Sequence, residues 1–213
     1  MNKGFFLKNT SLRALASGFT LSLIAALCVF LVLSAQHSTA TQIADNQDEK
    51  MKAVIKNLLP DDILNQETKL SCRLFSHDLI GKNMPLFIVE DLNGNSLGYI
   101  SSFSTSRGYS NPLILIAGLT EKFDLYKVDI QNSKETPGIG DKVDRKHGDF
   151  LEQLNHQNLH SIKWDVKKFG GDFDYITGAT VTSRAIVLAS RDLLEAINTT
   201  DVKSLPLCEG DKN

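Results

Sequence analysis

The sequence has 213 residues, of which 42% are hydrophobic and 23% charged, and its formal net charge is −2. This length allows one domain of ordinary size plus a short extra segment, and the composition excludes a disordered or fibrous protein. Three basic residues precede the first acidic residue, Asp45, so residues 45–213 carry a net charge of −5. An acidic main part argues against nucleic-acid binding, which requires a basic surface.

Residues 14–35 form an uncharged and strongly apolar run. As a helix, this run is long enough to cross a hydrocarbon layer of about 30 Å. Because basic residues precede it, the positive-inside rule predicts that residues 1–13 are cytoplasmic and that the rest lies on the far side of the membrane. The alternative is a cleaved signal peptide ending near Ser38–Ala40, but its apolar core would be unusually long. We therefore favour a retained transmembrane helix, in contact with membrane lipid through residues 14–35.

Residues 36–68 are expected to form a membrane-proximal linker that contains a short amphipathic helix at residues 47–59. Its apolar residues follow helical spacing: Met51, Val54, Ile55 and Leu58. Pro60 and the two aspartates after it are expected to end this segment. The main domain is then expected at residues 69–213.

The main domain begins with stretches typical of strands, expected at residues 70–75, 86–90, 96–103, 113–118 and 123–130. Asn93-Gly94 is a typical hairpin turn, and the continuous apolar run at residues 113–118 indicates a buried central strand. A polar loop is expected at residues 131–142 and a short helix at residues 149–154.

Residues 167–174 are expected to form a loop, and a helix is predicted from Thr180 to Ile197. The helix is indicated by apolar residues on one face: Ile186, Ala189, Leu193 and Ile197. The predicted fold is α+β: a single N-terminal transmembrane helix, followed by one domain with a twisted, mostly antiparallel sheet and flanking helices.

Two cysteines, Cys72 and Cys208, lie in the main domain. No Cys-x-x-Cys pair is present and no histidine stands at metal-ligand spacing, so no metal site is expected. A Cys72–Cys208 disulfide and two unpaired thiols both stay open, and an oxidising compartment would favour the disulfide.

The window Thr177-Gly-Ala-Thr180 stands where a loop passes into the predicted helix. Threonine is a common N-cap, and a helix start offers N–H groups that suit a phosphate. Gly178 permits close approach of a ligand to the backbone, and Ala179 adds little bulk. On its own the window predicts no more than a phosphate site, since hydroxyl-rich caps are common.

The longer window Asp174-x-x-Thr-Gly-Ala-Thr180 resembles the flavinylation motif of FMN-binding domains. In that family a flavin transferase uses FAD and magnesium to join FMN to the last threonine through a phosphoester. The resemblance implies a covalent FMN on Thr180, with Thr177, Gly178 and Ala179 beside it. It also implies that Asp174 takes part in recognition by the transferase.

Other segments are similar to the same family and follow its order. Glu135-Thr-Pro-Gly-Ile-Gly140 resembles a segment that lies against the flavin, which implies flavin contacts by four residues: Glu135, Thr136, Gly138 and Ile139. Residues 164–174 and the turn at residues 108–112 are also similar. With the anchor and the length, these segments resemble the G subunits of Rnf-type ion-translocating oxidoreductase complexes.

This resemblance implies an electron-carrier subunit of a bacterial inner-membrane complex that passes electrons between ferredoxin and NAD and moves ions across the membrane. Its domain would be periplasmic, and its partners would be the other membrane and peripheral subunits. No catalytic residue is expected on this chain, and no glycine-rich NAD motif follows a strand. Trp164 is expected to be a core or interface aromatic residue rather than an electron relay.

Three other interpretations stay open. The chain could be the C subunit of a sodium-pumping NADH:quinone reductase, which shares the fold and the flavin linkage. It could be a structural subunit with an unmodified threonine, or a stand-alone membrane-tethered periplasmic flavoprotein. The Gly-Gly-Asp-Phe-Asp run at residues 170–174 and the short length favour the Rnf type over the first of these.

Overall fold

The structure is a computed structural model, and it describes residues 18–34, 57–64, 67–109, 112–136 and 138–208. Residues 18–34 are helical, and the described residues from 57 onward belong to a separate compact unit. Among the described residues, no helix has the length and apolar character needed to cross a membrane. Both ends of the predicted span 14–35, and most of the linker helix expected at residues 47–59, lie outside the described residues.

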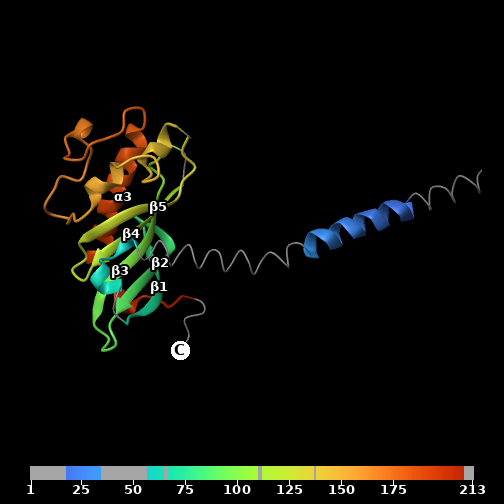
Figure 1. The fold of residues 1–213 in the computed structure, drawn as a ribbon, viewed down its shortest axis with the longest axis horizontal. Helices are drawn as coiled ribbons and strands as arrows, with labels where there is room; N and C mark the ends of the chain where they lie inside the picture. Colours follow the sequence, from blue (N-terminus) through green and yellow to red (C-terminus); the bar gives the residue numbers. More distant parts are fainter. Residues whose placement is uncertain (1–17, 35–56, 65–66, 110–111, 137, 209–213) are drawn as a thin grey trace, which may run out of the picture. The chain divides into compact units, whose positions relative to one another are not determined.

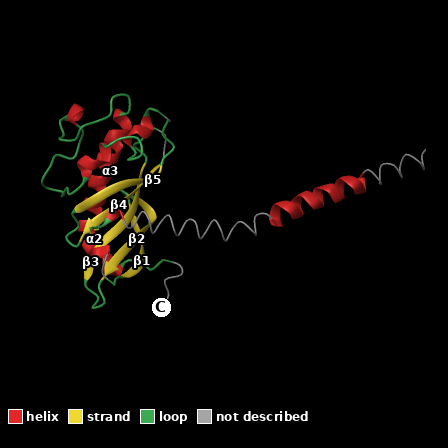
Figure 2. Ribbon diagram, viewed as in Figure 1, coloured by secondary structure: helices red, strands yellow, loops and turns green. Residues whose placement is uncertain are grey.

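Five strands form one antiparallel sheet in the order β1-β2-β3-β4-β5, as Figure 2 shows. Their bounds are Lys69–His77, Gly81–Glu90, Ser96–Thr105, Leu113–Thr120 and Leu125–Asn132. Each strand pairs with the next in the sequence, so the sheet is a meander and all its strand pairs are antiparallel. The predicted α+β domain with an antiparallel sheet is confirmed.

All five predicted strands are present, but β1 begins one residue earlier than expected, and β2 and β5 differ more. β2 begins at Gly81 and includes Pro85, which has no N–H to donate. This is tolerated because β2 pairs with β3 only from Leu86 onward. β5 begins at Leu125 rather than Phe123, because Phe123 has a φ of 62° and turns the chain.

The helix α3 (Thr180–Asn198) packs against β3 and covers one face of the sheet, as Figure 1 shows. It begins where predicted and extends one residue further. The four residues of its predicted apolar face are all buried. They belong to the same core cluster as side chains at alternate positions of the adjacent strands β3 and β4, which point to one face of the sheet: Tyr99, Phe103, Leu115, Ala117 and Leu119.

The opposite face of the sheet is covered in part by the segment that precedes β1. Leu58 and Leu59 are 1% and 3% exposed, and a Cβ atom at Gly118 would lie only 1.7 Å from the Leu58 carbonyl oxygen. A short helix, α2 (Asp61–Leu64), follows directly after Pro60. Pro60 and the aspartates therefore begin a helix instead of only ending one, since proline and acidic side chains both suit a first turn.

The long segment between β5 and α3 contains three short 3-10 helices: η1 (Gly140–Val143), η2 (Phe150–Leu154) and η3 (Lys167–Phe169). η2 lies where a short helix was expected, whereas η1 and η3 lie in the expected loops. Trp164 is 6% exposed and its ring centroid is 5.2 Å from that of Phe173, so it belongs to the core. In Figure 1 this segment gathers at the end of the sheet nearest α3.

After α3, the chain passes through η4 (Val202–Ser204) and returns to the outer edge of β1. The amide of Leu74 donates to the carbonyl of Pro206 at 2.8 Å, and the amide of Cys208 donates to the carbonyl of Cys72 at 3.1 Å. Cys72 and Cys208 are joined by a disulfide, with their Cα atoms 5.4 Å apart. The tail is thus fixed to the first strand of the sheet.

Candidate functional site

A cleft of about 460 Å³ lies at the start of α3. We call it the Thr180 cleft, and it is lined by Tyr109, Glu135, Thr136, Ile139, Gly140, Gly178, Ala179, Thr180, Val181 and Thr182. One wall comes from the segment after β5 and the other from the first turn of α3. Two segments that lie far apart in the sequence therefore meet at one site.

Thr180 occupies the first position of α3, and Ala179 is the N-cap residue, without a side-chain cap. The expectation that a threonine of this window caps the helix with its hydroxyl is therefore wrong for Thr180. Two other bonds shape the turn: the Ala179 amide donates to the Ile176 carbonyl at 2.9 Å, and the Ile176 amide donates to the Ser183 hydroxyl at 3.1 Å. Among the described residues, no partner binds the Thr180 hydroxyl, so its oxygen is available for chemistry.

The backbone at the helix start also suits an anion. The first amides of an α-helix have no carbonyl partner within the helix, and its dipole places partial positive charge there. Gly178 has a φ of 88°, a conformation that few other residues adopt, and it turns the chain into the helix. A phosphate on Thr180 would lie beside these amides.

The opposite wall is held by Glu135, which is 8% exposed. Its Oε2 atom accepts a hydrogen bond from the Thr182 hydroxyl at 2.9 Å. A Cβ atom at Gly140 would lie 2.7 Å from the same oxygen, so glycine is required for the loop to close on the glutamate. Glu135 therefore shapes this wall and connects it to α3.

The size and lining of the Thr180 cleft are compatible with a flavin. Ligand clefts commonly measure about 300–1,000 Å³ and combine apolar walls with a few polar groups. The apolar part here comes from Tyr109, Ile139 and Val181, while Glu135 and the threonines supply polar atoms. Among the described residues, no group of His, Cys, Asp or Glu is arranged to hold a metal ion.

Comparison with known proteins bears on this site directly. Residues 108–195 match the model of the FMN-binding domain, a range that contains every residue of the Thr180 cleft. The G subunit of the ion-translocating oxidoreductase complex of Shewanella baltica is 33% identical over 91% of this chain and 95% of its own length. The corresponding protein of Vibrio vulnificus is 32% identical over 86% of this chain and 89% of its own.

The chain belongs to the family of G subunits of ion-translocating oxidoreductase complexes. The predicted family is confirmed, and with it the predicted class of protein: a subunit of an oxidoreductase complex that carries an FMN-binding domain. The crystal structure of Shewanella oneidensis NqrC is also similar, with 22% identity, a TM-score of 0.41 and coverage of 58% of this chain and 63% of that one.

Not every site residue predicted from the family resemblance lines the cleft. Six of the predicted residues do: Glu135, Thr136, Ile139, Gly178, Ala179 and Thr180. Gly138 and Thr177 are exposed beside it, and neither lines it.

Asp174 lies apart from the cleft, in a neighbouring hollow with Gln153 and Tyr175. Its carboxylate is 75% exposed and pairs with Lys167 at 2.7 Å. The Gln153 side chain fixes the backbone here, since its oxygen accepts from the Asp174 amide at 2.7 Å. Asp174 is thus placed where another protein can reach it, and not where a ligand in the cleft would touch it.

Four lining residues of the cleft are absent from the predicted set: Tyr109, Gly140, Val181 and Thr182. Tyr109 and Gly140 belong to segments that resembled the family, but their positions relative to Thr180 depend on the fold. Val181 and Thr182 follow Thr180 on the helix, and that adjacency was the one signal for them in the sequence.

Proposed function

We propose that Thr180 carries FMN through a phosphoester and that the chain is an electron carrier within an ion-translocating oxidoreductase complex. The observation that carries this proposal is the Thr180 hydroxyl itself. It stands at a helix start, inside a cleft of suitable size, without a hydrogen-bond partner among the described residues. A nucleophilic oxygen has to be accessible, and this one is not engaged in capping the helix.

The attachment is a transfer from FAD by a flavin transferase with magnesium. The Thr180 oxygen attacks the phosphorus on the flavin side of the FAD pyrophosphate. A new O–P bond forms, the bond to the AMP phosphate breaks, AMP leaves and the hydroxyl proton is released. The amides at the start of α3 support the phosphate charge, and the exposed Asp174 serves recognition by the transferase.

Bound FMN supplies reversible acceptance and release of electrons. The chain's own residues position it: Glu135 and Thr182 fix the width of the cleft, while Thr136 and Ile139 lie along the same wall. Thr177 and Gly138 flank the attachment point. The covalent bond retains the flavin in an open cleft, where a neighbouring subunit can exchange electrons with it.

The location is part of the same proposal. Residues 14–35 would anchor the chain in the lipid of the bacterial inner membrane as a single helix, with residues 1–13 in the cytoplasm. Residues 36–68 would connect this anchor to a periplasmic FMN-binding domain at residues 69–213. The Cys72–Cys208 disulfide supports an oxidising compartment, so the transferase would act on Thr180 there.

In the complex, the chain would pass electrons along a route between ferredoxin and NAD, and the other membrane and peripheral subunits would be its partners. Its role is that of a relay, since the sequence has no glycine-rich NAD motif. Ion movement would be a property of the assembled complex.

Covalent attachment is tested by producing the full chain together with a flavin transferase. We expect the intact mass to increase by one FMN less one water, and the band on a denaturing gel to fluoresce under ultraviolet light. Thr180→Ala should remove both signals. Because the Thr180 side chain does not cap α3, the unfolding free energy of the Thr180→Ala chain should differ from the wild type by no more than about 0.5 kcal/mol.

Two variants serve as controls for this experiment. Thr180→Ser keeps a hydroxyl at the same position and should still accept FMN, whereas Ser161→Ala removes an exposed hydroxyl that does not line the cleft and should keep its covalent flavin. Covalent FMN on the Thr180→Ala chain, or an unmodified wild-type chain, would refute the proposal.

A further inference from the structure

Thr180 lines a second hollow, of about 350 Å³, in addition to its own cleft. We call it the basic hollow, and its lining residues include Arg107, Lys168, Phe169, Val181, Arg184 and Leu188. They come from the residues after β3, from η3 and from the N-terminal part of α3. Anything that fills this hollow lies directly beside the attachment threonine.

The charge of the basic hollow is opposite to that of the domain around it. Three cations and no carboxylate line it, although residues 69–213 carry a net charge of −2. The two carboxylates that bind its arginines lie deeper than the arginines themselves. Asp192 is 0% exposed beneath a 42% exposed Arg107, and Asp165 is 22% exposed beneath a 38% exposed Arg184. The outward surface is therefore positive.

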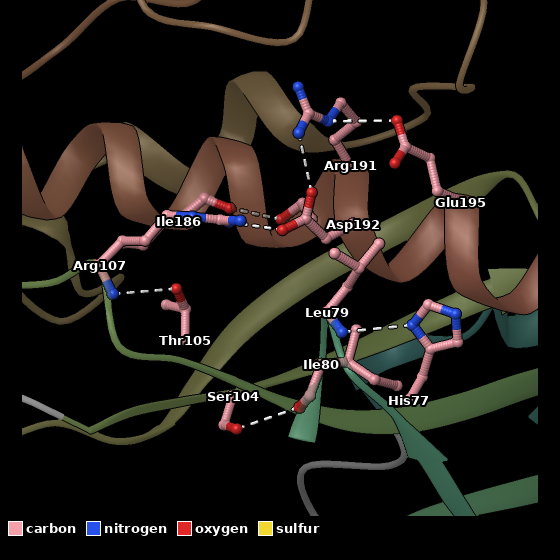
Figure 3. Close-up of polar contacts among 11 residues, drawn as sticks. His77, Leu79, Ile80, Ser104, Thr105, Arg107, Ile186, Arg191, Asp192 and Glu195 are labelled. Carbon is pink, nitrogen blue, oxygen red and sulfur yellow. Dashed lines mark hydrogen bonds and ion pairs between the residues drawn. The ribbon is translucent and has the colours of Figure 1, made fainter. Parts of the chain in front are cut away.

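Two carboxylates hold the arginines in place: Asp192, which is buried, and Asp165, which is partly buried. Figure 3 shows Arg107 donating to Asp192 at 2.5 Å, while the other oxygen of Asp192 accepts from Arg191 at 2.9 Å. Since an ionised carboxylate is costly to bury without such partners, this pair fixes Arg107 firmly. Figure 3 also shows the Arg107 amide bound to the Thr105 hydroxyl, which sets the direction of the chain.

Arg184 is fixed in the same manner by Asp165, with hydrogen bonds of 2.9 and 2.8 Å from its Nε and Nη2 atoms. Burial acts to raise the pKa of Asp165. The hydrogen bonds from Arg184 and the Val166 amide, with the charges of Arg184 and Arg191, outweigh burial, so the pKa is lower than its usual value of 3.8. Asp165 therefore stays ionised at neutral pH and keeps its hold on Arg184.

Phe169 is an exposed aromatic residue at the centre of these cations. Its ring is part of a side chain that is 51% exposed, and the Arg184 guanidinium lies 3.9 Å from the ring centroid. Lys168 lies over the same ring at 6.0 Å and, among the described residues, has no carboxylate partner. Arginines and aromatic residues dominate binding energy at protein interfaces, and side chains that are already ordered lose little entropy on binding.

We propose that the basic hollow is the docking surface for an acidic protein partner that exchanges electrons with the flavin on Thr180. The inference rests on the proposed function, because Thr180 is the lining residue that the hollow shares with the flavin cleft. Carboxylates of the partner would pair with Lys168 and the outward faces of the two arginines. An apolar side chain of the partner would cover Phe169 and Val181.

The test uses the intact, flavin-loaded complex that contains the full chain, mixed rapidly with NADH while flavin absorbance is followed. Lys168→Glu places a negative charge in the hollow, and we expect it to slow reduction of the Thr180 flavin by about tenfold at low salt. The difference should shrink at high salt, because exposed charges are screened. The matched control is Lys122→Glu, the same charge change on the exposed turn after β4, which should leave the rate unchanged.

Two further measurements separate the outcomes. Lys168→Arg keeps the positive charge and should be reduced at the wild-type rate. Slower reduction of Lys168→Glu would then follow from the reversed charge. Binding of the full chain to vesicles with anionic lipid is measured in parallel. If Lys168→Glu weakens vesicle binding and leaves flavin reduction unchanged, the hollow contacts lipid and the proposal is overturned.

Flavin content is measured first on every variant by intact mass. A wild-type chain without covalent FMN overturns both the proposed function and this inference. A fully flavinylated Lys168→Glu complex that is reduced at the wild-type rate, with the wild-type salt dependence, overturns this inference alone.

Discussion

Glu135 and Thr182 connect the two walls of the Thr180 cleft through one buried hydrogen bond of 2.9 Å. Gly140 completes this group, since a Cβ atom there would lie 2.8 Å from the Cβ atom and 2.7 Å from the Oε2 atom of Glu135. The width of the cleft thus depends on three residues that touch one another. A change at any one of them should therefore alter the width of the cleft.

Gly140→Ala tests this dependence. The added methyl group must displace Glu135, so we expect unfolding free energy to fall by about 1–3 kcal/mol, as for other overpacked sites. Covalent FMN loading should fall with it, because the first turn of α3 loses its contact with the opposite wall. Chemical denaturation and intact mass measure the two effects.

Lys134→Ala is the control, since Lys134 is exposed in the same loop and its truncation should change stability by no more than about 0.5 kcal/mol. A Gly140→Ala chain with wild-type stability and loading would show that Glu135 does not set the cleft.

The sequence predicted much of the site at this scale, because Thr180 and Glu135 belong to segments with a recognisable pattern. It did not predict the N-cap. The turn before α3 is closed by the amide of Ile176 on the Ser183 hydroxyl, so the helix has no need of the Thr180 side chain. This bond joins residues seven positions apart and forms only in the folded turn, so the N-cap preferences of single residues do not predict it.

At the scale of elements, the sheet and the segment before it are joined at a glycine. A Cβ atom at Gly118 would lie 1.7 Å from the Leu58 carbonyl oxygen, so the backbone of residues 57–59 lies directly on β4. Gly98 of β3 is similarly close, with its Cβ position 3.2 Å from Leu59. These glycines allow a segment outside the sheet to seal its second face.

Gly118→Ala should lift this segment from the sheet. We expect a loss of about 1–3 kcal/mol of unfolding free energy, because backbone atoms rather than a flexible side chain must move. Thermal unfolding of the full chain measures the change. The flavin loading should be kept, since Gly118 faces away from the core packed under α3.

A control on β3 should change stability in the opposite direction. Ser102 is 2% exposed, and its hydroxyl is buried without a hydrogen-bond partner among the described residues. Ser102→Ala removes this unsatisfied group and should stabilise the chain by about 1 kcal/mol. Equal unfolding temperatures for Gly118→Ala and the wild type would contradict the account of this face.

Apolar runs, alternation and turn residues together were enough to predict every strand, but pairing and backbone conformation decide where each strand begins and ends. Pro85 can stand within β2 because β2 pairs with β3 only from Leu86 onward. Phe123 does not belong to β5 because of its positive φ. The 3-10 helices η1 and η3 were not predicted, because the polar loops that contain them carry no periodicity. Residues 57 and 58 are helical, as the expected linker helix ending at residue 59 implies. Their contact with β4 was not predicted, although Gly118, a glycine within an apolar strand, was a sign of close backbone approach.

For the whole molecule, the Cys72–Cys208 disulfide closes a loop of chain with a sequence separation of 136. Closing a long loop restricts the unfolded chain, so replacing both cysteines by serine should lower stability by about 2–4 kcal/mol. Covalent FMN loading should persist, because the tail is bound to β1 and lines no part of the Thr180 cleft. Thermal unfolding with and without reductant measures the effect.

Cys28→Ser is the control for this prediction, since Cys28 is a free cysteine and its replacement should leave the unfolding of the domain unchanged. If reductant shifts the wild-type transition no more than it shifts that of the double variant, the disulfide contributes nothing to stability. The order of the strands and the return of the tail to β1 were not readable from the sequence, because both depend on contacts between distant residues.

Both outer strands of the sheet have part of their edges occupied by the chain's own backbone. Residues 206–208 pair along β1, and the Leu125 amide of β5 donates to the Gln157 carbonyl at 2.8 Å. An unpaired strand edge is a template on which another molecule can add a strand, and it is a frequent origin of aggregation. These contacts cover part of each edge, so only the remaining residues of β1 and β5 are available to pair with a strand of another copy.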